Sequence, residues 1–160
     1  MKTVLYNGIP DRDYVLSEDI EGIVIALKTR SIEKQQSIKE SLEAINWLKQ
    51  KGARKLYFKY CSTFDSTKDG NIGPVSDALL EYLDQRFTIL SPGLPINKRV
   101  VKDGILYVNE IPLGESYMKS HPLSPMWASS IEILMREQSK YPVFNINLKD
   151  LDFDVKLMDI

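Results

Sequence analysis

Short apolar runs of strand length alternate with longer amphipathic segments along this chain, and that alternation restricts its fold more than any other feature. The run at 20–28 is nearly continuous in Ile and Val, which predicts a strand buried on both faces. The other predicted strands lie at 3–9, 55–61, 87–90 and 143–148.

Three amphipathic segments predict helices between these strands. In the first, at 32–51, four apolar residues share one helical face, Ser31 can act as the N-cap and Gly52 can stop the helix. The other two helices are predicted at 72–84 and 129–139. Strands that alternate with helices are typical of an α/β fold, here a mostly parallel, Rossmann-like sheet flanked by helices.

The alternation is interrupted in the second half of the chain. Two short strand-like runs joined by Asp103-Gly104 predict a β-hairpin insertion near 99–110. The chain has 160 residues, 43% hydrophobic and 27% charged, which is the composition of one globular domain. We expect this domain to span 1–150, and the tail at 151–160 stays unassigned.

Composition also narrows the partners and the location. The 21 Lys and Arg residues balance 22 Asp and Glu residues, and no basic block is present, so nucleic acid is not an expected partner. The sequence shows neither an apolar run of membrane-spanning length nor a secretory signal, and its single cysteine cannot form a disulfide within the chain. The expectation is a cytoplasmic protein that does not contact a membrane.

Polar residues follow two of the predicted strands. The strand at 20–28 ends in Lys28, with Arg30 just beyond it, and the strand at 55–61 runs into the block from Lys59 to Thr67, which carries hydroxyls and a carboxylate. Ligands of parallel sheets bind beyond the carboxyl ends of the strands. Cations beside hydroxyl donors and a carboxylate suit a small, hydroxylated anion, because Arg pairs with carboxylates and Asp accepts from sugar hydroxyls. A sugar acid fits this set better than a nucleotide.

Simpler interpretations remain open for the same residues. Lys28 and Arg30 could be solvated residues at a strand end. Ser66, like the polar residues after it, could instead cap the helix that follows. His121 is the only histidine, and a lone loop histidine is more often structural than a ligand or a base. No zinc-ligand spacing and no phosphate-binding loop motif is found, so no metal site is predicted.

Longer motifs resemble the N-terminal, sugar-binding domain of the four-carbon acid sugar kinases, with the greatest similarity to the 3-oxo-tetronate kinase branch. The resemblance covers about residues 1–147. The motifs that carry it are Ala26-Leu27-Lys28-Thr29-Arg30, the block from Tyr57 to Leu80 with its signature Lys59-Tyr60-Cys61-Ser62-Thr63-Phe64-Asp65-Ser66-Thr67, the spaced pattern from Pro92 to Val108, Glu115-Ser116-x-Met118 and His121-Pro122-Leu123-Ser124-Pro125-Met126.

The resemblance implies an activity and a set of substrate-binding residues. In this family ATP, with Mg²⁺, phosphorylates the terminal hydroxyl of a 3-oxo-tetronate, and a separate domain holds the nucleotide. Arg30 and Lys59 are implied to bind the substrate carboxylate. The other implied substrate-binding residues are Ser62 and Thr63 as donors, Asp65 and Ser66 facing the sugar hydroxyls, and His121, whose role is undefined; no catalytic residue is assigned.

The sequence also departs from the family pattern. Neither the first strand with its Asp-Asp-x-Thr-Gly-Ala motif nor the nucleotide-binding half is found here, and Ala128 stands where the pattern carries Asp. We therefore expect the substrate-binding portion of a kinase, inactive by itself and lacking the ATP and Mg²⁺ site. The alternative is a stand-alone truncated homologue that binds sugar acids or has lost function. The expected partner is either a nucleotide-binding domain or a second copy in a homodimer that covers the sheet edge.

Overall fold

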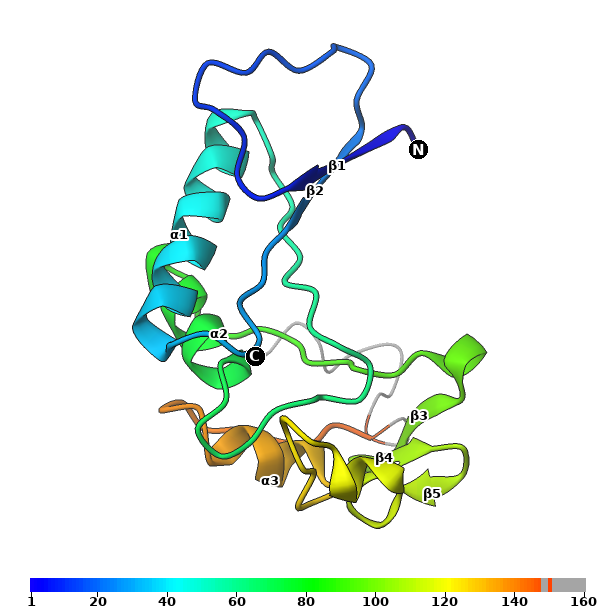
Figure 1. Ribbon diagram of the computed structural model, residues 1–160. Helices are drawn as coiled ribbons and strands as arrows, with labels where there is room; N and C mark the ends of the chain where they lie inside the picture. The colour runs from blue at the N-terminus through cyan, green and yellow to red at the C-terminus, as the bar shows by residue number, and fades with distance from the viewer. Residues whose placement is uncertain (148–149, 151–160) are drawn as a thin grey trace.

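The computed structural model describes residues 1–147 and 150 of the chain. Two small sheets organise this part of the chain. Strands β1 (Thr3–Asn7) and β2 (Gly22–Ala26) pair in parallel. Strands β3 (Arg99–Lys102), β4 (Ile105–Val108) and β5 (Ile111–Pro112) form an antiparallel sheet in that order. Figure 1 shows the two sheets at opposite ends of the molecule. The unassigned tail at 151–160 lies outside the described residues.

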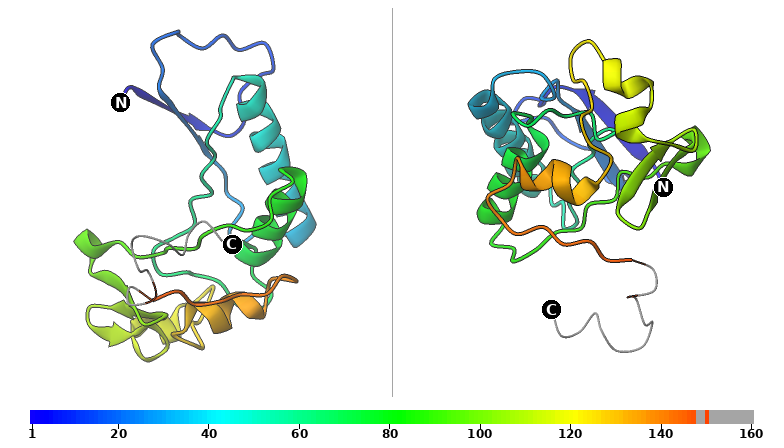
Figure 2. Two further views of the ribbon diagram at one scale, coloured as in Figure 1. Left: turned by 180° about the vertical axis from the view of Figure 1, so that it is seen from behind. Right: turned by 90° about the horizontal axis from the view of Figure 1, so that it is seen from below.

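Helices α1 (Lys34–Gln50) and α2 (Ile72–Tyr82) lie together on one side of the parallel sheet, as Figures 1 and 2 show from two directions. The ring of Tyr6 on β1 packs edge-on against Trp47 of α1, with 5.9 Å between their centroids. The short helix α3 (Ile131–Arg136) lies near the antiparallel sheet. Three single 3₁₀ turns connect these elements: η1 (Pro95–Asn97), η2 (Leu113–Glu115) and η3 (Tyr117–Ser120).

This architecture confirms the predicted α/β fold class, with a parallel strand pair, flanking helices and an inserted hairpin. The three predicted helices form, each somewhat shorter than expected. The N-cap of α1 is Glu33, whose carboxylate accepts from the Gln36 N–H, so the prediction of Ser31 was wrong. Gly52 does end the helix, and its φ of +85° is a conformation that costs other residues more than glycine.

Three predicted strands are not strands in the described part of the chain. The segments 55–61, 87–90 and 143–147 carry no ladder of backbone hydrogen bonds, and residue 148 lies outside the described residues. Four of their apolar side chains, Phe58, Tyr60, Leu90 and Val143, are partly buried against the main core. Others are exposed: Tyr57 is 78% exposed, Ile89 75% and Phe144 80%. The apolar pattern therefore identified some buried side chains, but it established neither strand pairing nor the burial of every apolar residue.

The expectation that β2 is buried on both faces was also wrong. Val24 is 46% exposed and its register partner Leu5 on β1 is 66% exposed. The helices cover only the opposite face, where Tyr6 meets Trp47. Within residues 1–147, one face of the parallel sheet is thus an uncovered apolar surface.

The hairpin forms as predicted. Asp103 and Gly104 both adopt positive φ, 49° and 75°, which matches the twist of the two strands that they join. Next to this sheet lies the main core, which α3 and the segment before α2 complete; its fully buried members include Phe64, Leu106, Leu113, Met126 and Leu134. None of the helices in the described ranges is both long and apolar enough to cross a membrane.

Candidate functional site

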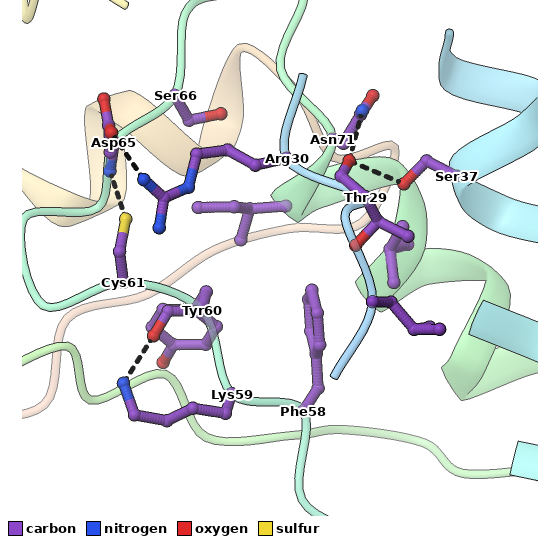
Figure 3. A pocket seen from close by; sticks show the side chains of 13 residues that line it. Thr29, Arg30, Ser37, Phe58, Lys59, Tyr60, Cys61, Asp65, Ser66 and Asn71 are labelled. Carbon is purple, nitrogen blue, oxygen red and sulfur yellow. Dashed lines mark hydrogen bonds and ion pairs between the residues drawn. The ribbon is translucent and has the colours of Figure 1, made fainter. Parts of the chain in front are cut away.

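A small cavity of about 110 Å³ lies beyond the carboxyl end of β2, where α1 and α2 begin. Parallel strands commonly place ligands at this position. Residues after β2, residues from the 58–66 segment and the start of α2 all contribute to its lining. Its polar lining includes Thr29, Arg30, Lys59, Asp65, Ser66 and Asn71. Figure 3 shows these side chains converging from separate parts of the chain.

An ion pair joins Arg30 and Asp65, two of the charged residues of this lining. Nη1 of Arg30 donates to Oδ2 of Asp65 over 3.0 Å. The Asp65 side chain is only 4% exposed, whereas the Arg30 side chain is 59% exposed. The buried carboxylate therefore holds a guanidinium whose remaining N–H groups are free to face solvent or a ligand.

The second oxygen of Asp65 is bound by a loop distant in sequence. The Ser124 hydroxyl donates to Oδ1 of Asp65. Nδ1 of His121 lies 3.8 Å from the same oxygen and accepts from the Ser124 backbone N–H over 3.1 Å. The loop that carries His121 is thus anchored on the carboxylate rather than on the cavity itself.

The backbone around Asp65 is held in an uncommon conformation. Phe64 has a φ of 47°, which is costly for a bulky side chain and requires support from its surroundings. That support comes from complete burial of Phe64, from the edge-on ring of Tyr60 at 5.4 Å, and from the Asp65 N–H, which donates to the Cys61 sulfur over 2.9 Å. This turn directs the Asp65 side chain toward Arg30 (Figure 3).

Ser66 bonds to a residue 72 positions away. Oε1 of Gln138, just after α3, accepts from the Ser66 hydroxyl over 3.1 Å and from the Gly73 N–H over 3.1 Å. Gln138 therefore occupies the N-terminus of α2, and the Gly73 N–H does not face the cavity as an anion donor. Ser66 does not cap α2, so the simple capping interpretation was wrong for this residue.

Asn71 and Ser37 fix the backbone that precedes Arg30. The Asn71 amide donates to the carbonyl oxygens of Thr29 at 2.8 Å and Ile32 at 2.9 Å. The Ser37 hydroxyl donates to the same Thr29 oxygen at 3.1 Å. These three bonds tie the N-terminal ends of α1 and α2 to the segment after β2. They thereby fix the backbone from which the Arg30 side chain extends.

Tyr60 and Lys59 form another part of the lining. Burial raises the pKa of Tyr60, although the Ser91 N–H that donates to its hydroxyl acts in the opposite direction. Nζ of Lys59 donates to the Tyr60 carbonyl over 2.7 Å and its side chain is exposed at the rim. Tyr60 therefore contributes a neutral wall, and Lys59 a cation that a bound anion could recruit.

Four of the residues implied by the resemblance meet at the cavity: Arg30, Lys59, Asp65 and Ser66. Ser62 and Thr63 lie in the turn between Cys61 and Phe64, outside the cavity lining, and His121 contacts Asp65 from the side. Sequence reasoning gave no role to Asn71, Ser124 or Gln138. Ser124 and Asn71 lie within or beside the quoted motifs, which was the only available signal, while nothing in the sequence marked Gln138.

A metal site does not fit the described residues. No three His, Cys, Asp or Glu side chains gather closely enough in residues 1–147 to hold an ion. In the cavity itself, both oxygens of Asp65 are already bound by Arg30 and Ser124. Cations beside buried oxygen acceptors suit a small, polar anion, and the described residues contain no cluster of three or more side chains that would form a metal site by themselves.

Comparison with known proteins matches this chain to one family over nearly its full length. A family model described as "Sugar-binding N-terminal domain" covers residues 1–159. A 3-oxo-tetronate kinase of Brucella melitensis is 45% identical over 152 residues, which are 95% of this chain and 34% of the relative. A 3-oxo-tetronate kinase of Salmonella typhimurium is 49% identical over 140 residues, 88% of this chain and 33% of the relative. The chain thus spans about a third of the length of these relatives.

Solved structures support the fold. A Haemophilus influenzae protein aligns with a TM-score of 0.88 and 45% identity, covering 93% of this chain and 36% of that protein. A Bordetella bronchiseptica protein, solved as a domain-swapped dimer with bound citrate, aligns with a TM-score of 0.70 at 22% identity over 84% of this chain and 34% of its own. At that identity the second likeness concerns the fold alone.

Proposed function

The chain belongs to the family of sugar-binding N-terminal domains, and from this membership we propose that its cavity binds a four-carbon sugar acid. The observation that carries the proposal is the exposed Arg30 guanidinium held in place by a buried carboxylate at the cavity. Arg binds carboxylates through two parallel hydrogen bonds, and prior orientation lowers the entropy lost on binding. The substrate carboxylate would lie against Arg30, with Lys59 closing over it.

The rest of the lining suits the hydroxylated part of such a ligand. Asp65 and Ser66 are buried oxygen-bearing side chains of the same cavity. Lone pairs that their present partners leave free can accept from sugar hydroxyls. The cavity volume of about 110 Å³ suits a ligand much smaller than a nucleotide. Ser62, Thr63 and His121 stay predicted substrate-binding residues, whose contribution would require a shift of their loops on binding.

We further propose that the chain is the substrate-binding portion of an ATP-dependent kinase that phosphorylates a 3-oxo-tetronate at its terminal hydroxyl. The names of the relatives support this reaction class. We propose that ATP and Mg²⁺ are held by a separate nucleotide-binding domain, in keeping with the lack of a cluster of three or more metal-ligating side chains among the described residues. We assign no catalytic step to this chain, and expect no phosphorylation by the chain alone.

A second candidate is a stand-alone homologue that binds sugar acids without phosphorylating them, or that has lost binding. The uncovered sheet face around Leu5 and Val24 favours an association in either case. For a kinase portion the partner is a nucleotide-binding domain, and for a stand-alone homologue it is a second copy. ATP-dependent phosphorylation of 3-oxo-tetronate by the purified chain would refute the second candidate. The absence of nucleic-acid and membrane partners, like the cytoplasmic location, remains a prediction from the sequence.

Calorimetric titration with 3-oxo-tetronate and with threonate tests the binding proposal. We expect saturable binding to the wild-type chain and at least a tenfold loss for Arg30→Ala, since one charge-assisted pair is worth about 1.5–3 kcal/mol. Arg86→Ala is the matched control, because Arg86 is an exposed arginine that does not line the cavity. Equal affinities for the two variants would contradict the assignment of Arg30, and no binding to the wild-type chain would contradict the function.

A further inference from the structure

Gln138 has no role in the function proposed above, yet its side chain touches the cavity lining through Ser66. Its Oε1 atom receives two hydrogen bonds of 3.1 Å, from the Ser66 hydroxyl and from the Gly73 backbone N–H. Its Nε2 group donates to the Leu134 carbonyl over 3.3 Å. All the polar atoms of this amide are therefore used inside the protein.

These contacts determine which way the amide faces. A backbone N–H can only donate, so the Gln138 atom beside Gly73 must be the oxygen. The Leu134 carbonyl can only accept, so the atom beside it must be the nitrogen. Reversing the amide would set two donors against each other at Gly73 and two acceptors against each other at Leu134. The orientation is thus fixed by its two backbone partners.

The fixed amide in turn determines whether the Ser66 hydroxyl donates or accepts in its hydrogen bond with Gln138. A hydroxyl has one proton, and next to an amide oxygen that proton must be donated. Ser66 is 4% exposed, and its hydroxyl is closely surrounded, since a methyl group on Gly70 would come within 1.7 Å of the Ser66 oxygen. With its proton donated to Gln138, the hydroxyl can offer the cavity only its acceptor lone pairs and no donor.

We propose that Gln138 is a positioning residue that makes Ser66 an obligate acceptor, so that the cavity selects a ligand with a hydroxyl at this point and rejects one with a second carboxylate. This inference rests on the proposed binding of a sugar acid. It orients that ligand: the carboxylate lies at Arg30 and Lys59, and a hydroxyl donates to Ser66. A four-carbon dicarboxylate fits the cation end but brings unpaired acceptors to Ser66.

Two probes of equal chain length test the selection, threonate and succinate. We expect the wild-type chain to bind threonate at least tenfold more tightly than succinate by calorimetry. Gln138→Leu frees the Ser66 proton, so the threonate-to-succinate ratio should fall at least threefold. Saturable threonate binding by Gln138→Leu shows that the variant is folded, because a loss of folding would abolish the binding of both acids. Gln138→Glu is not a conservative control, since its second oxygen would face the Leu134 carbonyl oxygen.

Ser66→Ala separates the roles of the two residues. This variant should lower the ratio by itself, and adding Gln138→Leu to it should cause no further fall, because Gln138 acts through the hydroxyl. Threonate binding by the wild type with an unchanged ratio in Gln138→Leu or in Ser66→Ala would overturn this inference alone. Failure of the wild-type chain to bind either acid would overturn the proposed function, and this inference with it.

Discussion

The carboxylate of Asp65, 4% exposed, accepts a 3.0 Å hydrogen bond from the guanidinium of Arg30, which is 59% exposed. The two partners of this hydrogen bond thus differ greatly in their exposure to solvent. Removal of Asp65 leaves an exposed guanidinium, which water can solvate, and the Ser124 hydroxyl without its acceptor. Removal of Arg30 instead leaves a buried carboxylate that keeps only its bond from Ser124. Both residues should therefore contribute to the fold, and Arg30, which is largely exposed, should contribute to binding as well.

Asp65→Ala should lower the free energy of unfolding by about 1–3 kcal/mol, because it leaves the Ser124 hydroxyl without its acceptor. Arg30→Ala should lower it by about 1–3 kcal/mol as well, because it leaves Oδ2 of the buried Asp65 without its partner. Urea denaturation followed by circular dichroism measures both values. A loss well below about 1 kcal/mol for Arg30→Ala would contradict the burial of the Asp65 carboxylate.

Ser124 and Asp65 should be energetically coupled although they are 59 residues apart. Each single alanine variant removes the same hydrogen bond, so the double variant should be less destabilised than the sum of the two. We expect a coupling of roughly 0.5–3 kcal/mol in a double-mutant cycle from urea unfolding. Pairing Asp65→Ala with Ser17→Ala, a change at an exposed serine, is the control and should be additive. A coupling near zero would show that the loop is not anchored on Asp65.

Gly73→Ala should destabilise the protein even though alanine favours helices. The added Cβ would lie 2.4 Å from the Gln138 Cβ and 2.7 Å from its backbone carbon, so the chain after α3 has to move. We expect a cost of about 1–3 kcal/mol from overpacking, against a gain of at most about 1 kcal/mol from helix propensity.

Gly93→Ala is the matched control for that substitution. Its nearest neighbour would be 3.8 Å away, an ordinary contact, and the change should stay within about 0.5 kcal/mol. Thermal and urea unfolding compare the two variants directly. If Gly73→Ala unfolds no more easily than Gly93→Ala, the close approach of Gln138 to α2 does not exist in solution.

Lys140 should control the titration of Glu81 on the surface of α2. The Lys140 ammonium donates to Glu81 and is the largest cause of the lowered pKa of that carboxyl, followed by the Tyr141 hydroxyl at 2.9 Å. Lys140→Met should therefore raise the pKa of Glu81 toward its ordinary value, but not fully, because Tyr141 still donates. Carboxyl NMR titration measures this shift, and Tyr141→Phe should produce a smaller one.

The same pair gives a pH dependence of stability with a defined sign. A carboxyl whose pKa is lowered on folding stabilises the protein above its unfolded pKa, and this contribution disappears as the pH falls through the folded pKa. The difference in melting temperature between wild type and Lys140→Met should therefore shrink on acidification from neutral pH. A difference that grew toward low pH would contradict the ion pair.

Local patterns in the sequence were sufficient for the helices and the hairpin. The apolar face of the first helix and the Asp103-Gly104 turn each depend on residues close together in the chain, so their signal is local. The same kind of pattern overpredicted strands at 55–61 and 87–90, because an apolar run does not show whether a neighbouring strand is present, and Tyr57, Phe87 and Ile89 in these runs are exposed. It also could not show that Val24 would stay half exposed.

By itself, the sequence determined the α/β class, the family resemblance and four of the residues that meet at the cavity. Tertiary structure alone decided what those residues do to one another. Asp65 accepts hydrogen bonds from Arg30 and Ser124, and Ser66 donates its hydroxyl proton to Gln138, 72 residues away. Hydrogen bonds between such distant residues leave no periodicity in the chain, because they depend on how the elements pack rather than on local backbone preference.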